Sequence, residues 1–199
     1  MKKMILLGSL ILSAAAGYAQ ESRQDVSISG FDLLGPQVTG NAVVLNPSTS
    51  GGVLASYRFL LTPRSALEAN YSFAQYTNYY TCCGLETTHI PVHSRAQEAS
   101  VAYVFGLSFK RYNPFVEAGV GGMVFTPILS GSYSLDVKQS TGIGGLFGGG
   151  LAYELSPSFD IRVQYRGFLV KAPTFGLPNF TLNRYEVITM PTAGIAYHF

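Results

Sequence analysis

The segment SFDIRVQYRGFLV, residues 158–170, places apolar and polar side chains at alternate positions. Successive side chains of a β-strand point to opposite faces, so this alternation predicts a strand with one apolar and one polar face. The apolar face is formed by Phe159, Ile161, Val163, Tyr165 and Leu169, and the polar face by Asp160, Arg162, Gln164 and Arg166.

The same period recurs along the chain and predicts eight strands. Their ranges are 25–34, 51–61, 65–77, 95–106, 114–126, 141–155, 158–170 and 184–199. The links alternate between short turns, LTPRS, FKRYN and SPS, and longer segments, 35–50, 78–94, 127–140 and 171–183. This pattern is typical of an all-β, eight-stranded antiparallel up-and-down transmembrane β-barrel, whose short turns and termini face the periplasm.

Composition separates a membrane barrel from its main alternative, a soluble lipocalin-like barrel that binds a ligand on an apolar inner face. Charged residues make up only 12% of this chain, which is too few for a water-facing charged surface. Small residues such as Gly144, Gly148, Gly150 and Ala152 share one face, which suits a narrow interior. An aromatic girdle at the membrane interface is predicted from Tyr57, Phe59, Tyr103, Phe105, Tyr153, Phe159, Tyr197 and Phe199.

The first nineteen residues have the pattern of a secretory signal peptide. Lys2 and Lys3 precede a short apolar run, residues 4–16, and small residues stand at Gly17 and Ala19. The run is shorter than the roughly 18 apolar residues that a membrane-spanning helix needs. We therefore expect residues 1–19 to be removed and residues 20–199 to form one barrel domain. The net charge of +2, without a large basic cluster, argues against nucleic acid as a partner.

Three stretches resemble the small eight-stranded outer-membrane β-barrel proteins of Gram-negative bacteria, of the opacity protein and outer-membrane protein A types. They are NPFVEAGVGG at 113–122, GGGLAYELSPSFDIRVQYR at 148–166 and GIAYHF at 194–199. In that family the barrel-assembly machinery reads a terminal aromatic residue after alternating apolar ones, and the resemblance assigns this role to Ile195, Tyr197 and Phe199. It implies a bacterial outer-membrane protein in contact with membrane lipids and lipopolysaccharide, and we expect a monomer. Longer relatives carry a peptidoglycan-binding domain after the barrel, and we expect none here.

The alternation also places acids and bases on the inward face. Antiparallel pairing across the turn LTPRS sets Arg58 opposite Glu68, Ser56 opposite Asn70 and Leu54 opposite Ser72. Charges in so narrow a barrel must be paired or hydrogen-bonded. We therefore predict a polar network that plugs the lumen, formed by Arg58, Glu68, Glu98, Glu117, Glu154, Arg162, Arg166 and Glu186.

The segment TCCGLETTHIPVH, residues 81–93, holds the densest set of reactive side chains: Cys82, Cys83, Glu86, His89 and His93. Such residues could bind zinc, but thiols in an exported loop tend to form disulfides. A disulfide between Cys82 and Cys83 is a candidate, although adjacent Cα atoms lie about 3.8 Å apart and would strain it. Pairing between chains and free thiols stay open. We predict no bound metal and no cofactor.

We expect the four long links to carry the function, and we expect this function to be binding rather than catalysis. Some small outer-membrane barrels hydrolyse lipid A with a Ser and His pair, but His93 and its neighbour Ser94 should point apart. A porin would need roughly 16 strands. We therefore expect no catalytic residue, and a scaffold whose loops meet another protein, a glycan or lipopolysaccharide. Aromatic residues of the links belong either to this surface or to an outer girdle: Tyr79, Tyr80, Phe175 and Phe180.

Overall fold

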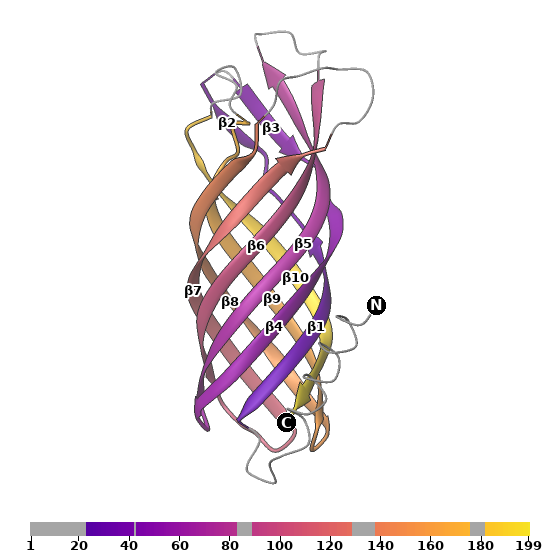
Figure 1. Cartoon of the computed structure of the whole chain (residues 1–199), viewed down its shortest axis with the longest axis vertical. Coiled ribbons are helices and arrows are strands. Elements are labelled where there is room, and N and C mark those ends of the chain that lie inside the picture. The colour runs from indigo at the N-terminus through magenta and orange to yellow at the C-terminus, as the bar shows by residue number, and fades with distance from the viewer. Residues whose placement is uncertain (1–22, 42, 83–88, 129–137, 176–181) are drawn as a thin grey trace, which may run out of the picture.

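The computed structural model describes residues 23–41, 43–82, 89–128, 138–175 and 182–199. Its long strands form a closed antiparallel barrel, which confirms the predicted fold class (Figure 1). Each has two barrel neighbours, and β1 closes the barrel by pairing with β10. The strands are β1 (Gln24–Leu33), β4 (Ser50–Thr62), β5 (Ser65–Cys82), β6 (His89–Gly106), β7 (Tyr112–Pro127), β8 (Ser140–Ser156), β9 (Phe159–Lys171) and β10 (Tyr185–His198). The predicted signal peptide lies outside the described residues.

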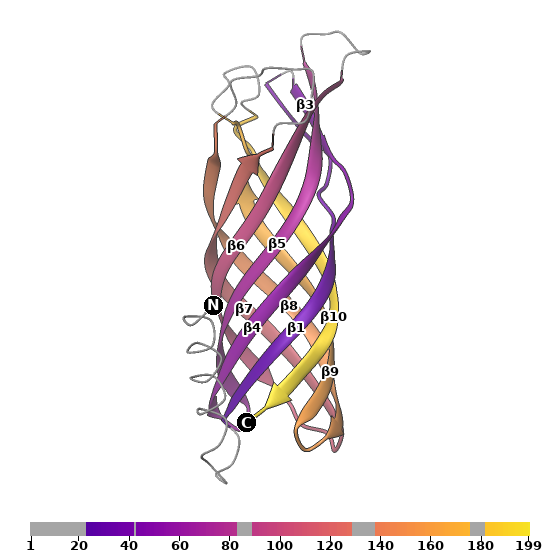
Figure 2. The ribbon, with the colours of Figure 1, turned by 45° about the vertical axis from the view of Figure 1, so that its right-hand side comes forward.

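Short and long links lie at opposite ends of the barrel. The short turns after β4, β6 and β8 share one end with the start of β1 and the end of β10 (Figure 2). We call this the turn end, and the opposite end, where the long links leave the strands, the loop end. The alternation of link lengths predicted from the sequence is confirmed in this arrangement.

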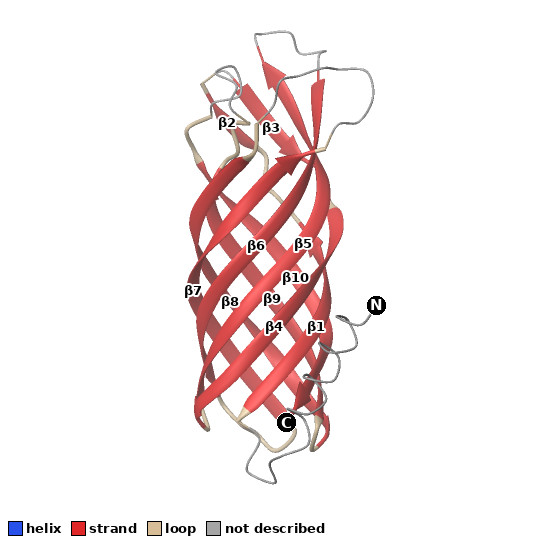
Figure 3. Ribbon diagram, viewed as in Figure 1, coloured by secondary structure: helices blue, strands red, loops and turns tan. Residues whose placement is uncertain are grey.

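The strands near the loop end differ from the prediction in extent. The predicted link 78–94 is mostly strand, because β5 and β6 stay paired as far as Thr81 and His89. The predicted link 35–50 contains two short strands, β2 (Val38–Gly40) and β3 (Val43–Pro47) (Figure 3). Strand β3 pairs with the part of β5 that lies beyond β4, from Val43 opposite Cys82 to Pro47 opposite Asn78. The barrel wall therefore extends higher on this side than the alternation alone predicts.

The barrel exterior is apolar. In β1, buried and exposed residues alternate strictly, and the outward set includes Ile28, which is 69% exposed. The outward face of β7 carries Val120 at 67% exposure, and that of β8 carries Ile143 at 84%. Rings at the turn end contact one another, with centroids 5.1 Å apart in the pair Phe159 and Tyr197. Within the described residues, no helix is long and apolar enough to cross a membrane.

The closing ladder between β1 and β10 is interrupted once. Pairing runs from Asp25 opposite His198 to Phe31 opposite Thr192, and resumes only where Leu34 and Thr189 exchange two backbone hydrogen bonds. Alternate residues of a strand direct their N–H groups to the same neighbour, so Pro191 should face β1. Proline has no N–H to donate, which accounts for the gap.

Candidate functional site

A cluster of charged side chains occupies the half of the lumen nearer the turn end. Arg58 on β4 donates its Nε hydrogen to Glu68 Oε2 on β5 at 2.6 Å. Arg162 on β9 donates from Nη2 to both oxygens of Asp25 on β1, each at 3.2 Å. Its Nη1 also lies 3.8 Å from Glu68 Oε2. The four buried side chains therefore form one network that crosses the lumen between four strands.

A second cluster surrounds Arg166, which is fully buried on β9. Its Nη2 donates to Glu98 Oε1 at 3.1 Å, and its Nε lies 3.3 Å from Glu117 Oε1. Glu98 also accepts hydrogen bonds from the hydroxyls of Ser72 at 3.0 Å and Ser100 at 2.7 Å. Neither oxygen of Glu117 accepts a hydrogen bond from a described residue. Two acids with unequal hydrogen bonding thus share one arginine.

The network predicted from the sequence did not include three residues that line the lumen here: Asp25, Asp160 and His198. His198 Nε2 lies 2.8 Å from Asp160 Oδ2, and its Nδ1 lies 4.0 Å from Asp25 Oδ2. The signal was present in the sequence, because Asp160 continues the inward series of Arg162 and Arg166 on β9. At the turn end, this inward series adds a rim of polar groups to the predicted network.

Two predicted network members lie apart from it. Glu154 is half-buried at the end of β8, beside the register shift between Glu154 and Ser156 that interrupts the inward alternation. Glu186 is buried near the loop end, and its partner across the strand pair is the apolar Val170. Neither acid forms an ion pair with any residue that the structure describes. Their strand positions are inward or nearly so, but no cation lies opposite them.

The half of the lumen nearer the loop end is mainly apolar, so the charged clusters around Arg58, Arg162 and Arg166 fill only the half nearer the turn end. The change occurs within single strands: on β9, Gln164 and Arg166 are followed inward by Phe168 and Val170. Most of the side chains in this apolar layer are uncharged, and Glu186 is a buried acid at its level. The larger apolar members of the layer are Phe31, Leu33, Leu45, Leu54, Tyr76, Tyr80, Met123, Phe125, Leu146, Phe168, Val170, Phe175, Leu182, Ile188 and Met190.

Aromatic residues expected at the surface of the links cover this apolar layer instead. Tyr80 and Phe175 are fully buried and meet edge to face, with ring centroids 6.3 Å apart. The Tyr80 hydroxyl donates to the carbonyl of Pro173 at 3.0 Å, which ties the segment after β9 to β5. Tyr79 points outward and is 40% exposed, while Phe180 lies outside the described residues.

The reactive residues of the segment 81–93 are only partly described. Cys82 ends β5 and His89 begins β6, whereas Cys83 and Glu86 lie outside the described residues. His93 Nδ1 lies 2.7 Å from Thr77 Oγ1 on the outer face. In the part of the chain that the structure describes, no group of three His, Cys, Asp or Glu side chains could hold a metal. The candidate disulfide and the expectation of no bound metal stay predictions.

The predicted assembly signal forms the outer face at the end of β10. Ile195 and Tyr197 are 53% and 41% exposed, and they alternate with the buried Ala196. Phe199 follows the strand, and its N–H donates to the carbonyl of Gln24 at 3.1 Å. The last residues are therefore held against the first described strand, and their role in assembly stays a prediction.

Comparison with known proteins yields matches in structure alone. No protein-family model and no curated protein matches the chain. The outer membrane protein OprG from Pseudomonas aeruginosa is similar with a TM-score of 0.64 and 11% identity, over 90% of this chain and 97% of OprG. Neisserial surface protein A gives a TM-score of 0.60 and 16% identity, over 89% of this chain and 98% of that protein. Ail, the attachment invasion locus protein of Yersinia pestis, is similar with a TM-score of 0.52 and 15% identity, over 90% of this chain and 100% of Ail.

The chain has the fold of the small outer-membrane β-barrel proteins. In such a barrel the apolar exterior contacts membrane lipid, which agrees with the exposed side chains of β1, β7 and β8. The soluble lipocalin-like alternative is therefore excluded, because the outward face of these strands is apolar, whereas a soluble barrel turns polar residues to water. In outer-membrane barrels of this kind the short turns face the periplasm and the long loops face the cell exterior, so we expect the turn end at the periplasm and the loop end outside.

Proposed function

We propose that this outer-membrane barrel is a non-enzymatic surface scaffold, whose rigid wall presents the four long links to a partner outside the cell. The observation that carries the proposal is the filling of the lumen. A charged network occupies the periplasmic half and an apolar layer occupies the extracellular half. Together these side chains fill the lumen and leave no room for a large water-filled channel, so transport of hydrophilic solutes is disfavoured.

The alternative of a lipid A hydrolase lacks a suitable constellation among the described residues. A hydrolase needs a base within hydrogen-bond reach of a nucleophile. His93 contacts the Thr77 hydroxyl rather than a serine and forms no ion pair with a described acid that could orient it, and the neighbouring Ser94 is fully buried in the lumen. His198 contacts two carboxylates at the periplasmic end, far along the strand from the leaflet that carries lipopolysaccharide. These placements support a non-enzymatic role over a lipid A hydrolase.

The partner that we favour is an anionic surface glycan or lipopolysaccharide. Three cations are exposed at the loop end, Lys138, Lys171 and Arg184, and the backbone of Arg184 pairs with that of Ala172 next to Lys171. One structure of the similarly folded Ail is a complex with the heparin analogue sucrose octasulfate. Exposed cations attract such ligands through screened, salt-dependent interactions. We also propose that the protein is a monomer and that residues 1–19 are a removed signal peptide.

The test compares the intact protein with a variant in which Lys138, Lys171 and Arg184 are changed to Gln. Binding to immobilised heparin and to lipopolysaccharide should fall at least tenfold in the variant and should weaken with salt. A matched control changes two exposed cations of the periplasmic end, Lys110 and Arg111, to Gln and should bind normally. Equal binding by all three proteins would contradict the glycan assignment. A large, stable conductance in planar bilayers would contradict the scaffold itself.

A further inference from the structure

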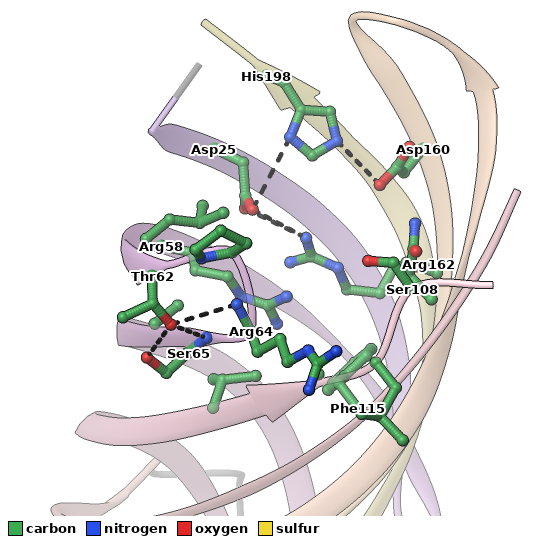
Figure 4. A pocket seen from close by; sticks show the side chains of 18 residues that line it. Asp25, Arg58, Thr62, Arg64, Ser65, Ser108, Phe115, Asp160, Arg162 and His198 are labelled. Atoms are coloured by element: carbon green, nitrogen blue, oxygen red, sulfur yellow. Dashed lines mark hydrogen bonds and ion pairs between the residues drawn. The ribbon is translucent and has the colours of Figure 1, made fainter. Parts of the chain in front are cut away.

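A cavity of about 160 Å³ opens at the periplasmic mouth of the barrel. All eight barrel strands contribute to its wall, and Figure 4 shows its side chains converging from opposite sides of the mouth. We call it the turn-end pocket. It lies at the opposite end of the barrel from the long links, so nothing in the proposed surface function uses it.

Three arginines point into the turn-end pocket: Arg58, Arg64 and Arg162 (Figure 4). Glu68 neutralises Arg58, and Asp25 neutralises Arg162. Arg64 is exposed and forms no ion pair with a described residue. The third acid of the wall, Asp160, is already paired with His198. When His198 is protonated beside Asp160, the pocket has one uncompensated positive charge, which matches a single negative charge on a ligand.

One buried donor in the pocket also lacks an acceptor. The Nε hydrogen of Arg162 has no partner among the described residues, although the side chain is only 3% exposed. Buried donors without acceptors are costly, and a carboxylate that enters the mouth supplies two acceptor oxygens. Guanidinium groups match carboxylates well, because their planar forks can donate two parallel hydrogen bonds.

One wall of the pocket is apolar. Ala66, Val104 and Phe115 form a small buried cluster, with Leu60 packed against it. The Phe115 ring lies below the guanidinium of Arg58, with the carbon atom 4.8 Å from the ring centroid. This wall is next to the arginines, so a ligand that carries a small alkyl group beside its carboxylate would contact both. A cavity of this size holds a group about as large as benzene.

We propose that the turn-end pocket binds the free carboxyl end of a peptide whose last side chain is small and apolar. The carboxylate is held by Arg64, with Arg58 and Arg162 behind it, and the side chain lies against Phe115. A doubly charged group such as phosphate would bring one negative charge more than the pocket can compensate. Free peptides and the peptide ends of cell-wall polymers or of other proteins share this chemistry, and all can approach from the periplasm.

The experiment uses the full chain, isotope-labelled and refolded in detergent, and follows its amide resonances by NMR. The probes are N-acetyl-Ala-Ala, the same dipeptide with its carboxyl end amidated, and inorganic phosphate. The free acid should cause saturable shifts at Ser65 and Ser108, which line the pocket, while the amide should not. Arg64→Gln should weaken binding of the acid about tenfold, because one charge-assisted hydrogen bond is lost. Arg111→Gln, an exposed arginine of the neighbouring turn that does not line the pocket, is the matched control and should bind normally.

Three results would overturn the proposal: no saturable shift with the acid, equal binding of the amide, or equal losses in the Arg64 and Arg111 variants. Tighter binding of phosphate than of the acid would also overturn it, because the pocket would then select charge rather than a carboxylate. A longer peptide tests whether the pocket recognises the free carboxyl end itself. If a long peptide with an internal Ala-Ala and an amidated end fails to bind while the free acid binds, the terminal carboxylate is the recognised group.

Discussion

Arg58 and Glu68 are Cα partners across the β4–β5 hairpin, and their side chains meet inside the barrel at a hydrogen-bond distance of 2.6 Å. Arg58→Ala should lower the free energy of unfolding by roughly 3 kcal/mol, because it leaves a buried carboxylate with only the more distant Arg162. Adding Glu68→Ala should recover part of that loss. The measurement is urea unfolding in detergent of both single variants and the double variant. Additive losses would show that the two side chains do not interact.

The two acids beside Arg166 should respond differently to neutralisation. Glu98→Gln should cost about 1.5–3 kcal/mol, because Glu98 accepts hydrogen bonds from Arg166, Ser72 and Ser100. Glu117→Gln should cost less than about 1 kcal/mol, since neither oxygen of Glu117 accepts a hydrogen bond from a described residue. Both substitutions keep the side-chain shape, and unfolding of the two variants can be compared directly. The reverse ranking would mean that Glu117 is the main counter-ion of Arg166.

Two glycines of β8 offer a test of how closely the lumen is packed. A Cβ atom at Gly148 would lie 2.7 Å from Glu117 Oε1 and 2.8 Å from the carbonyl oxygen of Tyr165, which is backbone and cannot move aside. Gly148→Ala should therefore cost about 1–3 kcal/mol of unfolding free energy. Gly145→Ala is the matched control, because a Cβ there meets nothing within 4 Å. Similar unfolding midpoints for the two variants would show that the lumen can expand.

Assembly should depend on the last residue. Phe199→Asp should leave export intact but reduce the amount of folded barrel in the outer membrane, because a charge then stands at the lipid-facing end of β10. Cell fractionation, with heat-dependent gel mobility as the test of folding, measures both quantities. His93→Asp, at an exposed position far from the closing end, is the control and should assemble normally. Wild-type levels of folded Phe199→Asp protein would exclude the terminal residue as an assembly signal.

Much of the fold could be predicted because the barrel is built from local patterns. Alternation is a property of each strand by itself, and it correctly separates Ile161 and Val163 on the outside from Arg162 on the inside. A short turn also determines pairing locally, which is why Arg58 was expected opposite Glu68. The same reasoning could not tell that Glu154 would lie opposite another acid, Asp160, just before the register shift beside the turn.

Local alternation and the turn residues are enough to predict the number of barrel strands, their two faces and the pairing across the short turns. Which charges meet across the lumen depends on the closed barrel: Arg166 contacts Glu98, 68 residues away, and Arg162 contacts Asp25, 137 residues away. These contacts join strands that are not neighbours, so they depend on how far each strand is displaced along the next when the sheet closes. The apolar layer under the long links depends on the same closure, because strands far apart in sequence reach one height only in the closed barrel. Alternation contains no information about that displacement, which is a property of the whole sheet.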